Sequence, residues 1–396
     1  MARSVFEPWV ARTSARLARG VDDLFCSTAL NPPKLMRRRS SAEGLGHAER
    51  MQALAAIGAF YARSEHLEPE ASFFPTPAPI HPTITARRAL GASGEVVDLR
   101  WPSAFKPLWS RASMEEALAS ASGEPAQPTP SDLRELRFDR SGELADKYLR
   151  AVRNQTCHAR WYRHHGGGRP CAVILHGYMA GAFAMEERIW DVPKLFRMGL
   201  DVLITVLPFH GPRRSERRGF LPPAFPSNDP RFTIEGFRQV MFDHQAVFAY
   251  LRREGVGELG LMGTSLGGYA AALLATLEPA LAFTVLFIPL ASTEDFARRH
   301  GRFIGTAEEQ DSQYRALQTA QWVVSPFARP PKIASERVLV IAGGSDLVTG
   351  AHDAQRLAQH FSAPTVTFPG GHLLHFGRGQ AFEAAHALLR RHGLAE

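Results

Sequence analysis

Short hydrophobic runs alternate with longer amphipathic segments through most of the chain after residue 91. Several runs are unbroken stretches of Val, Ile and Leu, which is typical of parallel strands covered on both faces. This alternation predicts the α/β class, with a doubly wound, mostly parallel, eight-stranded sheet. The predicted strands are residues 95–101, 157–163, 172–175, 202–207, 258–262, 283–288, 338–342 and 365–368, and helical patterns include residues 232–253, 266–277 and 351–361.

Two segments fall outside this alternation. Residues 1–90 contain an amphipathic helical pattern at 49–63 and a proline-rich stretch at 73–82, where each proline disfavours helix and central strand. We expect an N-terminal extension that packs on a catalytic domain formed by residues 91–396. The segment from about 293 to 330 is too long for a simple crossover, so we expect it to form a helical cap over one edge of the sheet.

The charge of the chain comes mostly from arginine. The formal net charge is +7, and only five of the 46 basic residues are lysine. Codon bias explains such an excess, and affinity for phosphates or acidic lipid surfaces is the functional alternative. No helix-turn-helix, zinc-finger or RNA-binding pattern is present, so we expect no nucleic-acid partner.

Cys26, Cys157 and Cys171 form neither a disulfide framework nor a metal-ligand spacing, which favours a reducing, cytoplasmic location. The N-terminus lacks the apolar run of a secretory signal. The most apolar region, 259–291, is interrupted by Gly, Ser, Glu and Pro and predicts strand, helix and strand rather than a membrane span. Peripheral membrane contact through arginines and an N-terminal helix stays open, as does the oligomeric state.

The pentapeptide Gly263-Thr264-Ser265-Leu266-Gly267 lies between a predicted strand and a predicted helix. Alone it is a weak signal, but strand, glycine-flanked serine and helix together are the setting of a nucleophile elbow. The two glycines leave room where the strand and helix backbones approach closely. Ser265 is therefore the candidate nucleophile.

A serine hydroxyl needs a base to take its proton, and the base needs an orienting carboxylate. Asp346 and His372 each follow a predicted strand directly after a glycine-rich turn, in the chain order Ser, Asp, His that α/β-hydrolases use. A turn or helix-capping role is the alternative for Asp346, and His375 is the rival base. The spacing of His372 and His375 lacks a nearby third ligand, so we expect no metal, and the chemistry needs no cofactor.

Backbone N–H groups must face the oxyanion of the tetrahedral intermediate. We expect one from Leu266, at the start of the predicted helix, and one from Tyr178, in the loop after strand 172–175, with Met179 as the alternative to Tyr178. His176 and His210 are candidate substrate contacts. Bracing of the loop is the alternative role of His176.

These motifs resemble the α/β-hydrolase superfamily over residues 91–396. The sequence Leu-Pro-Phe-His-Gly-Pro-Arg-Arg at 207–214, with Trp101-Pro102-Ser103 upstream, is similar to the α/β-hydrolase-18 family, whose members carry a Pro-Phe/Tyr-Tyr/His-Gly-x-Arg signature there. The resemblance implies an α/β-hydrolase fold with Ser265, Asp346 and His372 at the triad positions. Some relatives in that family are linked to lipid deacylation.

Arg213 and Arg214 follow the carboxyl end of a predicted strand, so the sequence places them at the border of the active site. We hypothesise that both bind an anionic part of the substrate bidentately. The alternative is a solvated arginine-rich face beside Glu216.

Taken together, the residues predict a serine hydrolase that cleaves a carboxylic ester or thioester, from a small molecule or a lipid, through an acyl-enzyme. Two alternatives stay open: a peptidase or amidase of the same fold, and a catalytically inactive hydrolase fold that serves as a binding or scaffold protein. No propeller-like domain that would select peptides is evident and no triad residue is missing, which favours the esterase.

Overall fold

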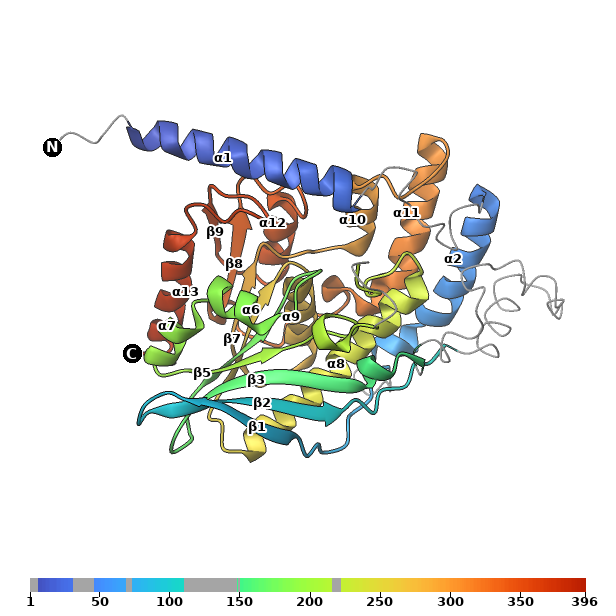
Figure 1. Ribbon diagram of the computed structural model, residues 1–396. Coiled ribbons are helices and arrows are strands. Elements are labelled where there is room, and N and C mark those ends of the chain that lie inside the picture. The colour runs from blue at the N-terminus through green and yellow to red at the C-terminus, as the bar shows by residue number, and fades with distance from the viewer. Residues whose placement is uncertain (1–5, 31–45, 69–72, 110–147, 149, 216–221) are drawn as a thin grey trace.

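A computed structural model describes residues 6–30, 46–68, 73–109, 148, 150–215 and 222–396. These residues contain one nine-stranded sheet, with helices on both of its faces (Figure 1). The strands lie in the order β1-β2-β3-β5-β4-β6-β7-β8-β9. The predicted α/β class is confirmed.

The sheet has an antiparallel and a parallel part. β1 (Thr83–Ala89), β2 (Gly94–Pro102), β3 (Thr156–His164) and β5 (Asp201–Thr205) pair antiparallel in that order. The strands parallel to β5 and to one another are β4 (Cys171–Leu175), β6 (Leu259–Thr264), β7 (Leu281–Phe287), β8 (Val338–Gly343) and β9 (Thr365–Phe368). The parallel part therefore brings its carboxyl ends to a single edge.

Strand β1 is the ninth strand and lies within the segment that we expected to be an extension. Every residue of its sequence Thr-Ile-Thr-Ala-Arg-Arg-Ala is exposed, so no buried face produces a hydrophobic pattern. Its arginines suit an edge strand, because charged side chains discourage pairing with other chains. The observed sheet thus differs from the predicted one by this edge strand.

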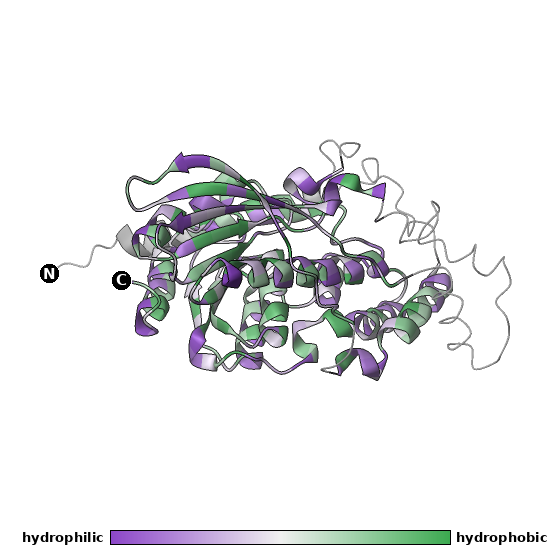
Figure 2. Ribbon diagram, turned by 90° about the horizontal axis from the view of Figure 1, so that it is seen from below, coloured by the Kyte–Doolittle hydropathy of each residue, from purple (hydrophilic) through white to green (hydrophobic). Residues whose placement is uncertain are grey.

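Helices cover the sheet in two layers that enclose separate hydrophobic clusters. One face packs on α8 (Pro230–Arg253), α9 (Leu266–Leu277) and α12 (Ala351–His360), and the other on α7 (Val192–Arg197) and α13 (Gly379–Arg391). Figure 2 shows hydrophobic residues along the interior strands and mixed colours on the surface helices. The remaining short helices are α6 (Phe183–Ile189), η2 (Ser64–Leu67), η3 (Val152–Gln155), η4 (Gly211–Arg213), η6 (Trp322–Val324), η7 (Pro326–Ala328) and η8 (Ser335–Arg337).

The N-terminal segment contributes α1 (Phe6–Phe25), η1 (Cys26–Leu30) and α2 (His47–Tyr61). Helix α2 packs on α11 (Ala307–Gln321), which follows α10 (Thr293–Arg299) in the segment expected to form a cap. Tyr61 of α2 is buried in the core and donates a hydrogen bond to Glu235 of α8 at 2.6 Å. Helix α1 lies across the end of the molecule formed by β8, β9 and α12 (Figure 1).

Within the described ranges, no helix combines the length and the apolar character that crossing a bilayer requires.

Candidate active site

Ser265 lies in the turn between β6 and α9 with a backbone φ of +54° and ψ of −114°. A non-glycine residue in this region is strained, and such strain is typical of functional turns. A Cβ on Gly263 would lie 2.3 Å from the carbonyl oxygen of Gly267. A Cβ on Gly267 would lie 2.1 Å from the carbonyl oxygen of Leu175. Both positions of the pentapeptide therefore require glycine.

The structure brings the side chains of Ser265, His372 and Asp346 together. The Nε2 atom of His372 lies 2.9 Å from the Oγ atom of Ser265, and its Nδ1 atom lies 2.8 Å from the Oδ2 atom of Asp346. His372 follows β9 and Asp346 follows β8, so the carboxyl ends of neighbouring parallel strands deliver both groups. An ionised Asp346 accepts a hydrogen bond from the Nδ1–H of His372, which leaves Nε2 free to accept the serine proton.

The carboxylate of Asp346 is held by its own loop. It accepts hydrogen bonds from the backbone N–H of Val348 at 2.8 Å, from that of Thr349 at 3.0 Å and from the Thr349 hydroxyl at 2.8 Å. Burial raises the pKa of Asp346, but attraction to His372 and these hydrogen bonds outweigh it and lower the pKa to about 2. The group is therefore ionised throughout the neutral range.

His372 and His375 have different surroundings. Burial lowers the pKa of His372, but the charge and hydrogen bond of Asp346 outweigh this and raise it above the ordinary histidine value. The Nε2 atom of His375 lies 2.9 Å from the backbone carbonyl oxygen of His372, and burial lowers the pKa of His375 to about 4. His375 therefore braces the loop, and His372 is the ring that reaches Ser265.

The loop after β4 packs against the elbow. A Cβ on Gly177 would lie 3.4 Å from the Cβ of Ser265 and 3.6 Å from the carbonyl oxygen of Thr264. Leu266 begins α9 directly after the serine, and Tyr178 follows Gly177. The assignment of their N–H groups to the oxyanion stays a prediction.

His176 is fully buried beneath this loop and is not available as a substrate contact. Its Nδ1 atom donates to the Gly177 carbonyl at 2.7 Å, and its Nε2 atom accepts from the backbone N–H of Leu207 at 3.0 Å. Burial lowers its pKa to about 4, so the ring is neutral. His176 therefore has the bracing role, connecting the loop after β4 to the end of β5.

His210 was also a candidate substrate contact, and burial argues against that role. Its ring is fully buried, its Nδ1 atom donates to the Pro208 carbonyl at 2.8 Å, and its centroid lies 5.0 Å from the ring of His176. Burial lowers the pKa of His210 well below the ordinary value. The two histidines form a neutral packed pair behind the loop.

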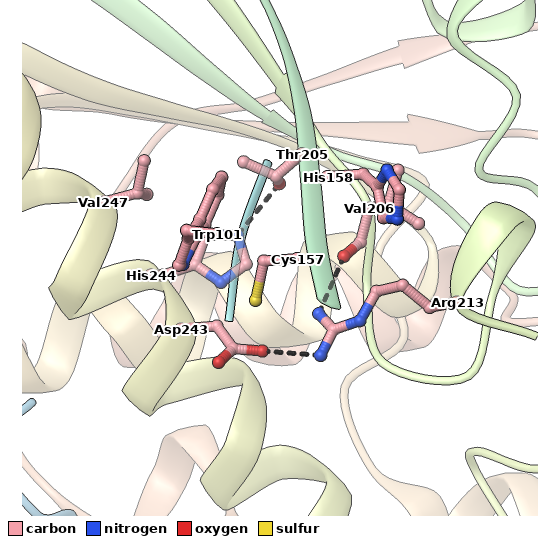
Figure 3. A pocket seen from close by; sticks show the side chains of 9 residues that line it. All are labelled: Trp101, Cys157, His158, Thr205, Val206, Arg213, Asp243, His244 and Val247. Atoms are coloured by element: carbon pink, nitrogen blue, oxygen red, sulfur yellow. Dashed lines mark hydrogen bonds and ion pairs between the residues drawn. The ribbon is translucent and has the colours of Figure 1, made fainter. Parts of the chain in front are cut away.

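Arg213 points into the protein, and the expectation that it binds an anionic substrate group is wrong. Its guanidinium donates to Asp243 at 2.8 Å, to the Asn154 carbonyl at 2.9 Å and to the Val206 carbonyl at 3.1 Å, and the side chain is 1% exposed (Figure 3). The adjoining cavity holds only about 10 Å³, about the room of one water molecule. Arg213 instead ties the loop after β5 to α8.

Arg214 directly follows the short helix η4 and is half-buried, and it stays a candidate for binding an anionic part of the substrate. Glu216, the acidic neighbour in the alternative interpretation, lies outside the described residues. Within the described ranges, no three His, Cys, Asp or Glu side chains are grouped as metal ligands would be.

One residue at this edge was missed by the sequence analysis. Asp22 of α1 is fully buried and accepts a hydrogen bond from the backbone N–H of His372 at 2.6 Å. The two residues are separated by 350 positions in the chain. No local pattern signals such a contact.

Comparisons with known proteins agree with this architecture. Residues 236–312, which include the elbow and α9, match the family model described as alpha/beta hydrolase domain containing 18. Two relatives from Mycobacterium tuberculosis, the uncharacterized proteins MT2702 of strain CDC 1551 and Rv2627c of strain H37Rv, are each 30% identical over 240 residues. That match covers 59% of this chain and 56% of each relative, so the chain spans about half the length of the curated relatives it matches.

Two solved structures share the fold. An acetyl xylan esterase from Paenibacillus sp. R4 has a TM-score of 0.50 and 15% identity, over 83% of this chain and 92% of that one. Acetyl xylan esterase 1 from Thermoanaerobacterium sp. JW/SL YS485 has a TM-score of 0.51 and 14% identity, over 83% and 93%. The chain therefore has the fold of these esterases, the α/β-hydrolase fold, and its residues 236–312 are similar to the family alpha/beta hydrolase domain containing 18.

Proposed function

We propose that this chain is a serine hydrolase that cleaves a carboxylic ester or thioester through an acyl-enzyme formed on Ser265. The observation that carries the proposal is the hydrogen-bonded series Ser265–His372–Asp346, with separations of 2.9 and 2.8 Å. The names of the two solved neighbours, both acetyl xylan esterases, favour an ester over an amide.

The acylation half of the reaction follows from this arrangement. The Oγ atom of Ser265 attacks the carbonyl carbon of the substrate while the Nε2 atom of His372 takes the hydroxyl proton. The carbonyl oxygen becomes an oxyanion, which the N–H groups of Leu266 and Tyr178 bind in our assignment. Collapse of the intermediate breaks the bond to the leaving group, which takes the proton from His372.

Deacylation uses the same groups in reverse. A water molecule attacks the acyl-serine, His372 accepts its proton, and the proton returns to Ser265 as the carboxylic acid leaves. Asp346 holds the imidazole in the required tautomer and stabilises its charged form. His372 accepts the serine proton only when its imidazole is neutral, so activity should rise with pH as the imidazole loses its proton. Because Asp346 raises the pKa of His372, this rise should lie above the ordinary histidine value.

Labelling with a fluorophosphonate probe tests the nucleophile directly. We expect wild-type protein to be modified on Ser265 and the Ser265→Ala variant to remain unlabelled. Equal labelling of both proteins, or no labelling of the wild type, would refute the proposal.

Matched substrates then separate the reaction classes. A series of p-nitrophenyl esters from acetyl to long-chain acyl, a thioester and the corresponding anilide should show ester or thioester turnover in the wild type that Ser265→Ala abolishes. Faster cleavage of the anilide would favour the amidase. Labelling without turnover of any substrate would favour the binding protein.

A further inference from the structure

Helix α1 carries a carboxylate that connects the two loops of the triad. The Oδ2 atom of Asp22 accepts from the backbone N–H of His372 at 2.6 Å and from that of Leu347 at 3.2 Å, and Oδ1 accepts from that of Leu373 at 2.9 Å. Leu347 follows Asp346 in the loop after β8, and Leu373 follows His372 in the loop after β9. One side chain from outside the sheet thus contacts both loops.

The packing around this carboxylate is close. A Cβ on Gly371 would lie 2.7 Å from the Oδ2 atom of Asp22 and 3.3 Å from the Cβ of Ala18, one turn earlier on α1. Ala18 and Asp22 are both fully buried, whereas their helical neighbours Leu17 and Asp23 are exposed. The close approach of α1 therefore favours glycine at position 371, directly before His372.

Asp22 has no counter-charge from the neighbouring positions of its own helix. It lies in the last turn of α1, which contains no basic residue. Burial of a carboxylate also costs free energy unless hydrogen bonds replace its hydration. The three backbone N–H donors supply that replacement, and two of them belong to the loop of the catalytic base.

We propose that Asp22 is a positioning residue for His372, and that α1 is thereby a working part of the active site. This inference rests on the proposed function, because positioning the base has a kinetic consequence only if His372 activates Ser265. By holding His372, Leu373 and Leu347 with one carboxylate, Asp22 fixes the separation of the base from the acid. A small displacement of a catalytic group can cost about 100-fold in rate.

The charge of Asp22 acts on His372 as well. Burial lowers the pKa of His372, while Asp346 and, after it, Asp22 raise it. In the part of the chain that the structure describes, His300 and His375 also interact with this ring, and burial lowers the pKa of both. Removal of the Asp22 charge should therefore lower the pKa of His372. In the pH profile of kcat/KM, the acidic limb, where activity rises with pH, should then move to lower pH.

The test compares Asp22→Asn with Asp23→Asn in the full chain. Asparagine keeps the shape of Asp22 but turns an NH2 group toward backbone donors, while Asp23 is the exposed neighbour with the same charge. We expect Asp22→Asn to lose about 10–100-fold, mainly in kcat, with the acidic limb shifted to lower pH. Asp23→Asn should keep the wild-type kcat and pH profile.

Hydrogen exchange provides a readout that does not need turnover. Peptides covering residues 343–350 and 370–376 should exchange faster in Asp22→Asn than in the wild type, while those from the central strands should not change. If Asp22→Asn does not fold, Asp22→Glu keeps the charge and moves the oxygens by one methylene. The Asp22→Glu variant should then have a kcat at least about fivefold lower than the wild type, while the acidic limb of its pH profile stays in the wild-type position.

The outcomes separate this inference from the proposed function. Failure of the probe to label wild-type protein refutes the proposed function, and with it the kinetic role of Asp22, whatever hydrogen exchange shows. Labelled wild type with an unchanged kcat, pH profile and loop exchange in Asp22→Asn would overturn the inference alone. An unchanged kcat in the Asp22→Glu variant would do the same.

Discussion

Arg213 provides a sharp test of the difference between a structural and a substrate-binding arginine. The change is Arg213→Met, which keeps an unbranched apolar side chain, shorter than arginine, and removes the charge and the donors. In the wild type, the guanidinium contacts Asp243, whose side chain is only 5% exposed, and two backbone carbonyls. The substitution leaves a buried carboxylate without its counter-charge, with hydrogen bonds from the Ser103 hydroxyl at 2.6 Å and from the Cys157 thiol.

The expected effect is a large loss of stability. Removal of one partner of a buried ion pair costs about 3–5 kcal/mol, because the other charge stays buried without its counter-charge. Since domains unfold with about 5–15 kcal/mol in total, Arg213→Met should still fold at low temperature. Adding Asp243→Asn removes the uncompensated charge, so the double variant should recover about 1–3 kcal/mol.

Urea unfolding measures the stability, and ester hydrolysis measures the function. Because the side chain is 1% exposed, the ratio of kcat/KM for a neutral acetate ester to that for a matched hemisuccinate ester should not change. The reasoning is refuted if Arg213→Met unfolds at the wild-type urea concentration and loses activity only on the anionic ester. That result would restore the original hypothesis of an anion-binding arginine.

Three further predictions concern the triad and its turns. The pKa of Asp346 falls from 3.8 to about 2 on folding, so its ionised form contributes about 2 kcal/mol to the free energy of unfolding. This contribution is present above pH 4 and is lost as the pH falls toward 2. If the Asp346→Asn variant shows the same loss of stability in acid as the wild type, the prediction is contradicted. His375→Gln should keep kcat within about tenfold, whereas His372→Ala should lose about 10⁴-fold or more, and the opposite order would make His375 the base. Gly267→Ala places a Cβ 2.1 Å from the carbonyl oxygen of Leu175, so it should lower the free energy of unfolding by about 1–3 kcal/mol or more. It should also lower fluorophosphonate labelling of Ser265. A variant that melts at the wild-type temperature would contradict the geometry of the elbow.

All eight predicted strands are present, and those buried on both faces have continuous hydrophobic sequences. β8 is one such case, since Val338–Gly343 is buried at every position. β1 could not be predicted in this way, because each of its seven residues is exposed at the edge of the sheet. Its pairing with β2 comes from backbone hydrogen bonds, which leave no periodicity in the side chains.

The candidate triad could be located for a similar reason. Ser265, Asp346 and His372 each follow a parallel strand, and topology places those strand ends on one edge. Arg213 also follows a parallel strand, yet its side chain turns inward to Asp243, 30 residues later. Position after a strand therefore predicts the edge on which a residue lies, but not the direction in which its side chain points.

Asp22 extends this distinction to the stability of the site. The sheet brings Ser265, Asp346 and His372 to one edge through strands that do not include α1, so we expect the core to stay folded when α1 detaches. The loops that carry Asp346 and His372 are held to each other partly by the Asp22 carboxylate, which α1 alone provides. Conditions that release α1 should therefore lower activity by about 10–100-fold before they unfold the sheet. Loss of activity and loss of the core helical signal at the same denaturant concentration would show that the two are one cooperative unit.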